Sequence, residues 1–371
     1  MAVQHGFGAS ITDSLIFAYD TIDTTNSYLG EPTTNLVIAP DGNANVVTAD
    51  VPIGVNVSGY AQYNSGYFVN PRNTVNTAAT GRTFTYSVWM RSRTATPSTY
   101  LMYVFTGTGP DGGWWYFGDG PLTNQWTKYT YSRNDMTGTV SQVTVYRYNQ
   151  QGTIEIAAPQ IEIGSRATQF VNGSRSANQG LLDLTGRSTI NISNVSFNSN
   201  SQMVFDGTND YGQTGVFVPN ITDKTYEAVT RVYDINHQAG GVIGIMGENG
   251  EPFDTIVYNE TGQGWGFGST GFQRTAWSGV KETTTGFVHL VATYSNYSYK
   301  LYRNGQLILT TTAYPILNYN FNSVIIFGKR HGTTTGPYNG EIPVAKIYNR
   351  VLSQTEVTQN FKKYQTRFGI S

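Results

Sequence analysis

The alternation of apolar and polar residues is clearest over residues 287–309, FVHLVATYSNYSYKLYRNGQLIL. Val288, Leu290 and Ala292 alternate with mostly polar neighbours, and this period of two is typical of a β-strand with one buried face. The dipeptide Asn304-Gly305 divides the second half of the stretch. Asn-Gly is the strongest short signal for a hairpin, because both residues of a type I′ turn need a positive φ. The stretch therefore predicts a three-stranded meander in which Leu290 is buried.

Short alternating runs, separated by clusters of Gly, Pro, Asn and Ser, recur along the rest of the chain. Before residue 172 we expect strands near residues 14–20, 45–50, 65–70, 83–92, 99–106, 113–117, 125–132, 140–149 and 153–163. This spacing is typical of a β-sandwich. Near the other end, Ser353 is followed by Glu356, which predicts the capping box of a short helix.

Composition favours sheets over helices and narrows the range of partners. Only 13% of the 371 residues are charged, while Gly, Thr, Ser, Asn and Tyr are abundant. A net charge of −1 and a sequence pI near 6.4 give no electrostatic reason to expect nucleic acid or a membrane as a partner. The chain has no cysteine, which excludes disulfides and thiolate metal sites. We identify neither a membrane-spanning run nor a secretory signal.

The central meander also carries a family resemblance. The segments HLVATY at 289–294 and KLYRNG at 300–305 resemble the centre of concanavalin A-like lectin/laminin G-like jelly rolls. Other segments that resemble this family follow one another in the family's order, at residues 180–186, 202–211, 226–233, 324–328 and 339–353. The resemblance implies a second β-sandwich, closed by the short C-terminal helix.

A second resemblance covers the earlier strands. Residues 84–92, FTYSVWMRS, and 124–129, NQWTKY, resemble inner strands of carbohydrate-binding-module-like jelly rolls. The segment APQIEIGSRATQFV, residues 158–171, resembles the exit of such modules in phage tail, fibre and other virion proteins. This resemblance implies that Trp89 and Trp126 are core residues.

The lectin-like resemblance is split along the chain. Residues 14–20 and 26–28 match its opening, and 180–186 match the continuation. Since surface loops tolerate insertions whose ends lie close together, we interpret the intervening module as an insertion. We expect an all-β protein with two jelly-roll β-sandwiches, the first inserted into the opening loop of the second. The expected parts are a tail (1–11), the first strand and loop of the lectin-like domain (12–34), the inserted carbohydrate-binding-module-like sandwich (35–172) and the remainder of the lectin-like domain (173–371).

Catalytic patterns are not found. Glycosidases that resemble this jelly roll carry Glu-x-Asp-x-x-Glu or a near variant, which supplies an acid and a nucleophile. The nearest grouping, Glu248, Glu251 and Asp254, has the wrong spacing and is interpreted as a solvated turn. Gly266-x-Gly268-x-x-Gly271 matches a dinucleotide fingerprint, but no helix is predicted after it. We therefore expect no catalytic residues and no cofactor.

Metal sites are not predicted either. The histidines are scattered singly, at His5, His237, His289 and His331. The strand pattern puts His289 on the surface of its sheet. Asp206 and Asp210 are alternative calcium ligands, but a turn at Asp206-Gly207 needs no metal.

Aromatic residues are the remaining candidates, because sugars stack their C–H faces on Trp and Tyr rings. In the first module, Trp114 and Trp115 beside Asp119 suit carbohydrate binding. Neighbours in a strand face opposite ways, so one tryptophan is expected in the core and the other exposed. In the lectin-like domain the candidates lie in loops that we expect to gather at one rim, namely Trp265, Trp277, His331 and Tyr338. The alternative for each residue is ordinary packing or contact with another subunit.

The two resemblances together imply a function. We expect a non-enzymatic structural and adhesion protein of a tailed-phage virion, such as a capsid decoration, fibre or tail-associated protein that binds host-surface glycans. One alternative is a capsid or tail cement protein without glycan binding, and another is a polysaccharide depolymerase, which the missing carboxylate pair disfavours. The expected partners are other virion subunits, copies of the chain in a homo-oligomer and a host-surface glycan. The expected location is the virion, assembled in the host cytoplasm and extracellular in the particle.

Overall fold

The computed structural model describes residues 12–24, 26–36, 45–47, 50–53, 55, 57, 60–63, 68–78, 80–93, 101–108, 113–116, 122–134, 138–147, 153–198, 200–312, 319, 322–332 and 335–371, in some strands by their backbone alone. The chain divides into two compact units, unit 1 (Met1–Glu31 and Ala177–Ser371) and unit 2 (Pro32–Ser176). The predicted tail, residues 1–11, lies outside the described residues. None of the helices in the described ranges is long and apolar enough to cross a membrane.

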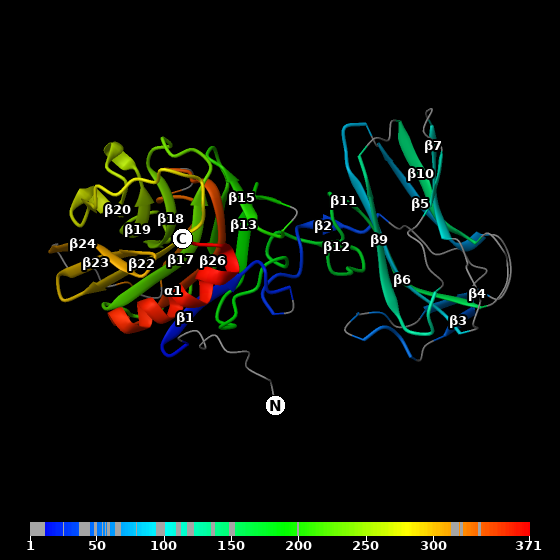
Figure 1. The fold of residues 1–371 in the computed structure, drawn as a ribbon, viewed down its shortest axis with the longest axis horizontal. Coiled ribbons are helices and arrows are strands. Elements are labelled where there is room, and N and C mark those ends of the chain that lie inside the picture. Colours follow the sequence, from blue (N-terminus) through cyan, green and yellow to red (C-terminus); the bar gives the residue numbers. More distant parts are fainter. Residues whose placement is uncertain are drawn as a thin grey trace. The chain divides into compact units, whose positions relative to one another are not determined.

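Both units consist of antiparallel sheets (Figure 1), which confirms the all-β prediction. In unit 1, one sheet comprises β1 (Leu15–Asp20), β14 (Ser196–Phe197), β15 (Met203–Asp206), β17 (Lys224–Val232), β22 (Val288–Ser295), β23 (Ser298–Arg303), β24 (Gln306–Thr312) and β26 (Asn339–Tyr348). The other comprises β13 (Ile190–Ser193), β16 (Tyr211–Thr214), β18 (Gly240–Gly247), β19 (Phe253–Tyr258), β20 (Trp265–Ser269), β21 (Ala276–Trp277) and β25 (Ser323–Phe327).

The two sheets of unit 1 share one hydrophobic core. Ala228 and Leu290 from the first sheet belong to the same buried cluster as Ile256 and Phe327 from the second. Leu290 is completely buried, as the alternation of its strand predicts. The order of the first sheet is β14-β15-β26-β17-β22-β23-β24, and that of the second is β13-β16-β25-β18-β19-β20-β21. Consecutive β22, β23 and β24 form the predicted meander.

The opening strand lies beside the closing strand of unit 1. β1 pairs antiparallel with β26, with Phe17 opposite Ile347 and Asp20 opposite Val344. Two segments on either side of unit 2 in the sequence therefore belong to one sheet. That unit 2 was inserted into an opening loop of unit 1 stays a prediction, because strand pairing does not record how the chain arose.

The C-terminal helix α1 (Gln354–Phe368) lies over the outer face of β17 and β22 (Figure 1). Its capping box is formed as predicted, since the Ser353 hydroxyl accepts a hydrogen bond from the backbone N–H of Glu356. His289 is completely buried under this helix, with its ring 5.6 Å from that of Tyr364. The expectation that His289 lies on an open sheet surface is therefore wrong, because α1 covers that surface.

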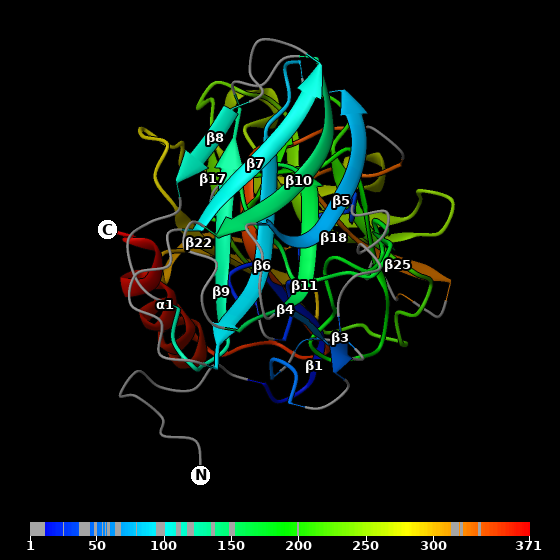
Figure 2. The same cartoon turned by 90° about the vertical axis from the view of Figure 1, so that its right-hand side faces the viewer.

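Unit 2 has two main sheets, which Figure 2 shows as successive layers. The first comprises β3 (Asn45–Val47), β4 (Tyr60–Tyr63), β11 (Ile154–Ile163), β6 (Phe84–Ser92) and β9 (Thr127–Arg133), in that order. The second comprises β5 (Phe68–Ala78), β10 (Thr139–Arg147), β7 (Leu101–Thr108) and β8 (Gly113–Tyr116). The short strands β2 (Thr33–Thr34) and β12 (Ser174–Arg175) pair where the chain enters and leaves unit 2.

Candidate carbohydrate-binding site

The outer face of the five-stranded sheet of unit 2 carries a polar cluster. In β6 the apolar residues occupy alternate positions and are completely or almost completely buried, namely Phe84, Tyr86, Val88 and Met90. Since successive strand residues face opposite ways, Trp89 and Arg91 must point away from that core. Trp89 is half-buried and Arg91 is 5% exposed.

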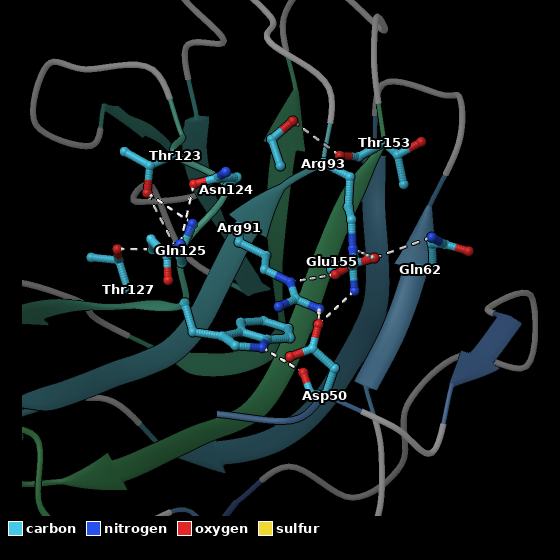
Figure 3. Close-up of polar contacts among 12 residues, drawn as sticks. Asp50, Gln62, Arg91, Arg93, Thr123, Asn124, Gln125, Thr127, Thr153 and Glu155 are labelled. Carbon is cyan, nitrogen blue, oxygen red and sulfur yellow. Dashed lines mark hydrogen bonds and ion pairs between the residues drawn. The ribbon is translucent and has the colours of Figure 1, made fainter. Parts of the chain in front are cut away.

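Three strands contribute a row of hydrogen-bonded side chains across this face. Arg91 lies opposite Glu155 of β11, and Glu155 lies opposite Gln62 of β4. The Arg91 Nε–H donates to one carboxylate oxygen of Glu155, while Gln62 Nε2 donates to the other at 3.2 Å. Arg93 Nε also donates to Glu155, at 3.0 Å. Figure 3 shows this row, in which the buried carboxylate of Glu155 joins Gln62 to the two arginines.

Trp126 lies against this row and is held on two sides. Its indole Nε1–H donates to the backbone carbonyl of Asp50 at 2.7 Å. The guanidinium carbon of Arg91 lies 4.3 Å from the centre of the indole and 5.3 Å from that of the Tyr60 ring. Cation–π contacts of this kind fix the orientation of an aromatic ring. Trp126 nevertheless remains half-buried, so part of its ring is accessible.

The charges at this face balance. The Asp50 carboxylate lies 2.9 Å from Arg91 Nη2 and 2.7 Å from Arg93 Nη2, and the hydrogen bond from Arg91 lowers the pKa of Asp50. Burial would lower the pKa of Arg91, but its bonds to Asp50 and Glu155 outweigh this and raise it. Two cations and two anions therefore neutralise one another. These four charged groups carry no net charge together, which suits a neutral ligand beside them better than an ionic one.

Exposed polar residues flank Trp126 along the chain. Thr123, Asn124, Gln125 and Thr127 are all exposed and gather beside Arg91 in Figure 3. Their bonds to one another are local, such as the 3.2 Å bond from the Gln125 backbone N–H to the Thr123 hydroxyl. Amides and hydroxyls both donate and accept hydrogen bonds, as sugar hydroxyls do. A partly exposed indole with such residues next to it in the chain is chemically suited to a saccharide.

The expectation that Trp89 and Trp126 are core residues is wrong, since both are half-buried. The alternation within FTYSVWMRS already places Trp89 in one set with Ser87 and Arg91, opposite the apolar set. For Trp126 the sequence contains no comparable alternation, because this residue precedes β9. Its position depends on the pairing of β6 with β9, in which Trp89 lies opposite Lys128.

The candidates predicted in unit 2 remain untested. Trp114 and Trp115 belong to β8, opposite Val104 and Tyr103 of β7, and the described structure covers only their backbone. Asp119 lies outside the described residues.

The four candidates in the lectin-like domain do not form one exposed rim. Trp265 and Tyr338 are completely buried, which corrects the expectation for both. The Trp265 indole N–H donates to Glu282, and the Tyr338 hydroxyl is hydrogen-bonded to that of Thr230 at 2.6 Å, so each polar atom has a partner inside the fold. Trp277 and His331 are half-buried and remain candidates.

The acidic residues considered for catalysis or metal binding have other roles. Asp254 is buried and paired with Arg274 at 2.8 Å, so it does not belong to a solvated turn as expected. Asp210 accepts a hydrogen bond from the backbone N–H of Asp206 at 2.9 Å, which is a turn contact. Within the described ranges no three His, Asp or Glu side chains gather in a way that could hold a metal ion.

Comparisons with known proteins agree with the fold of unit 1. The profile of the Concanavalin A-like lectin/glucanases superfamily matches residues 206–358, all of which belong to that unit. No curated protein matches the chain.

Similar solved structures are distant in sequence. Domain 4 of AbnA, a GH43 extracellular arabinanase from Geobacillus stearothermophilus in complex with arabinotriose, is 14% identical with a TM-score of 0.42, and the match covers 50% of this chain and 92% of that one. The ligand binding domain of botulinum neurotoxin serotype D, in complex with N-acetylneuraminic acid, is 14% identical with a TM-score of 0.35, covering 51% and 49%. Trypanosoma rangeli sialidase is 15% identical with a TM-score of 0.40, covering 52% and 32%.

Proposed function

We propose that this protein is a non-enzymatic adhesion protein that binds a saccharide on the Trp126 face of unit 2. The observation that carries the proposal is the half-buried indole of Trp126, which Arg91 and Asp50 hold in place and which has exposed amide and hydroxyl side chains next to it in the chain. A rigid, partly exposed aromatic ring loses little conformational freedom when a ligand stacks on it. Its rigidity therefore favours binding.

The polar neighbours supply the orientation that stacking lacks. The exposed side chains of Thr123, Asn124 and Gln125, which precede Trp126 in the chain, carry both donors and acceptors. Asp50 adds a carboxylate whose side chain is 57% exposed and whose charge is balanced by the two arginines. A neutral sugar ring can therefore bind without leaving a buried charge unpaired.

The carboxylates of this face support a binding role over a catalytic one. A glycosidase needs one carboxyl group that carries a proton and a second that attacks or activates water. Arg91 keeps the pKa of Asp50 below its ordinary value, and Glu155 is buried and bonded to Arg91, Arg93 and Gln62. Neither group is placed to donate a proton to a glycosidic oxygen.

The proposal extends to a tailed-phage virion, in which unit 1 and unit 2 would contact other virion subunits and a host-surface glycan. It rests on the resemblance of residues 158–171, in which the buried side chains of Gln160, Glu162 and Thr168 form a hydrogen-bonded network. Glu162 accepts hydrogen bonds from the backbone N–H and the hydroxyl of Thr168 at 2.8 and 2.7 Å, and Gln160 accepts from the backbone N–H of Val171 at 2.8 Å. The resembling residues are thus those that close the module. A cement protein without glycan binding is the alternative.

The test is affinity electrophoresis of the full chain through gels that contain bacterial surface polysaccharides. We expect a polysaccharide that retards the protein, and we expect Trp126→Ala to weaken retention at least about tenfold, since aromatic anchors carry much of such binding energy. Trp126→Phe keeps an aromatic ring and should retain part of the affinity. Circular dichroism and thermal unfolding check that both variants fold.

Three outcomes would contradict the proposal. If the gel retains Trp126→Ala as strongly as the natural sequence, Trp126 does not belong to the binding site. No retention of the natural sequence by any polysaccharide, with binding to other virion subunits, would favour the cement alternative. Release of reducing ends from the retained polysaccharide would identify a depolymerase.

A further inference from the structure

We propose that unit 1 carries a second saccharide platform, built on Trp277, so that the chain binds a polysaccharide at two separate sites. This inference extends the proposed glycan binding, but it rests on different residues in a different unit. Trp277 is half-buried and belongs to β21, the last strand of its sheet, where it lies opposite Gly266 of β20.

The Trp277 ring packs directly against Gly266. A Cβ atom added at Gly266 would lie 2.3 Å from Cε3 and 2.8 Å from Cζ3 of the indole, so the ring lies directly over this glycine. Gly266 is absent from the residues with positive φ, so close packing excludes a side chain here, from the ring and from the Ala276 carbonyl oxygen, which would lie 2.4 Å from the Cβ. A glycine inside a strand weakens it and often marks a close approach of a ligand or another group.

An arginine–glutamate pair lies beside this ring. Gly268 shares the face of Gly266, two residues along the strand, which is roughly 7 Å away. A Cβ at Gly268 would lie 3.5 Å from Cδ of Arg330, whose guanidinium forms an ion pair with Glu260. The side chains of Arg330 and Glu260 are 17% and 11% exposed, so both reach the surface while holding each other in place. They can bond the hydroxyls of a sugar stacked on Trp277.

His331 lies next to the Arg330–Glu260 pair. Its ring stacks on Phe253, with centres 4.2 Å apart and planes 12° apart, and its Nε2 lies 3.5 Å from Nη2 of Arg330. The Arg330 carbonyl accepts a hydrogen bond from the Thr255 hydroxyl at 2.8 Å, which fixes the segment on the sheet. The indole over Gly266, the Arg–Glu pair and the stacked imidazole therefore adjoin on one face, where Trp277, Arg330 and His331 are each partly exposed.

The arrangement repeats the chemistry of the Trp126 face with other residues. Both faces combine a half-buried tryptophan with an arginine bonded to a carboxylate on a sheet surface. Two linked sites raise the apparent affinity for a long polysaccharide because the second contact is intramolecular. The predicted ligand is thus the same class of saccharide, bound in two places by one chain.

The test compares the natural sequence with Trp277→Ala, Trp126→Ala and the double variant. The probe is a short oligosaccharide cut from the polysaccharide that the full chain retains, and the readout is the indole N–H resonance of each tryptophan during titration. We expect the resonances of Trp277 and Trp126 to shift in the natural sequence, while that of buried Trp265 stays in place. Each single variant should lose one set of shifts, and each should bind the long polysaccharide at least about tenfold more weakly.

The outcomes separate this inference from the proposed function. If the Trp277 resonance does not shift and Trp277→Ala retains full affinity, the proposal of a second platform is wrong, while the Trp126 site stands. If only Trp277 responds, the proposed site on unit 2 is wrong while the platform stands. Gly266→Ala keeps the indole but displaces it together with the adjoining Ala276 backbone, and it should weaken the Trp277 response while leaving that of Trp126 unchanged. Thermal unfolding of each variant distinguishes lost binding from lost folding.

Discussion

A single buried carboxylate organises the region beneath α1. Glu227 accepts hydrogen bonds from His289 Nε2 at 2.8 Å, from the Tyr348 hydroxyl at 2.7 Å and from Asn360 Nδ2 at 3.1 Å. Burial would raise the pKa of Glu227, but the ammonium group of Lys346, 3.5 Å away, and the bonds from His289 and Tyr348 lower it to about 2. The helix is thus joined to the sheet by a charge that must stay ionised.

This network predicts a loss of stability in acid. The folded-state pKa of Glu227, about 2, lies below its value in the unfolded chain, roughly 4.3. The stabilisation is therefore complete above about pH 5 and falls as the pH drops, by about 2 kcal/mol at pH 3. Urea unfolding between pH 7 and pH 3 measures it. Glu227→Gln should be less stable at pH 7 and should vary less with pH than the natural sequence.

The exposed glutamate Glu248 provides the matched control. Glu248→Gln should leave the stability and its pH dependence unchanged. A Glu227→Gln variant whose stability falls with pH as steeply as that of the natural sequence would contradict the role of this carboxylate.

The burial of some of these residues could be predicted from the sequence and that of others could not, for physical reasons. Leu290 was predictable because its burial depends on strand alternation alone. The burial of His289 was not, because it depends on a helix more than 60 positions further along the chain. The half-buried state of Trp126 likewise depends on Arg91 and Asp50, which pairing of distant segments brings to it.

Among the elements, the β23–β24 turn is the clearest agreement between sequence and structure. Asn304 and Gly305 have φ values of 50° and 76°, as a type I′ turn requires. The Asn304 side chain also accepts a hydrogen bond from the backbone N–H of His289 at 2.9 Å. The turn therefore fixes the register of the hairpin and contacts the neighbouring strand.

Replacing both turn residues by alanine should destabilise unit 1. Alanine resists positive φ, and a Cβ at Gly305 would lie 3.1 Å from Cδ1 of Phe361, so we expect a loss of roughly 1–3 kcal/mol. Asn304→Gly keeps the conformational freedom and loses the side-chain bond, so it should cost less. Urea unfolding measures both, and an unchanged midpoint for the double alanine variant would contradict the turn assignment.

Strands were predictable where their residues alternate and missed where glycine hides the pattern. β6 and β11 begin and end within one residue of the predicted 83–92 and 153–163. β18, with the sequence GGVIGIMG, had no such period. A Cβ at its Gly241 would lie 2.3 Å from the backbone of Arg330, so packing against a distant loop selected the glycine. That loop carries Arg330, so the sequence predicted Trp277 and His331 as candidates but not the Arg330–Glu260 pair beside them.

At the scale of the molecule, the two compact units predict two unfolding transitions. Leu290 of unit 1 and Met90 of unit 2 are both completely buried. Leu290→Ala and Met90→Ala should each cost about 2–5 kcal/mol through lost burial and a residual cavity. In differential scanning calorimetry each variant should lower one transition and leave the other in place. A single transition that both variants shift would mean that the units unfold together.

The pairing of β1 with β26 has a consequence for synthesis on the ribosome. Phe17 reaches its partner Ile347 only after residues 18–347 have been made. At roughly 5–20 residues per second, the delay is on the order of tens of seconds. Unit 2, residues 32–176, is complete long before that and can fold first. Through this interval the apolar side chains of Ile16 and Phe17 have no sheet to cover them, which makes the opening strand a site for chaperone binding. The nascent chain carries one finished unit between two unfinished parts of the other.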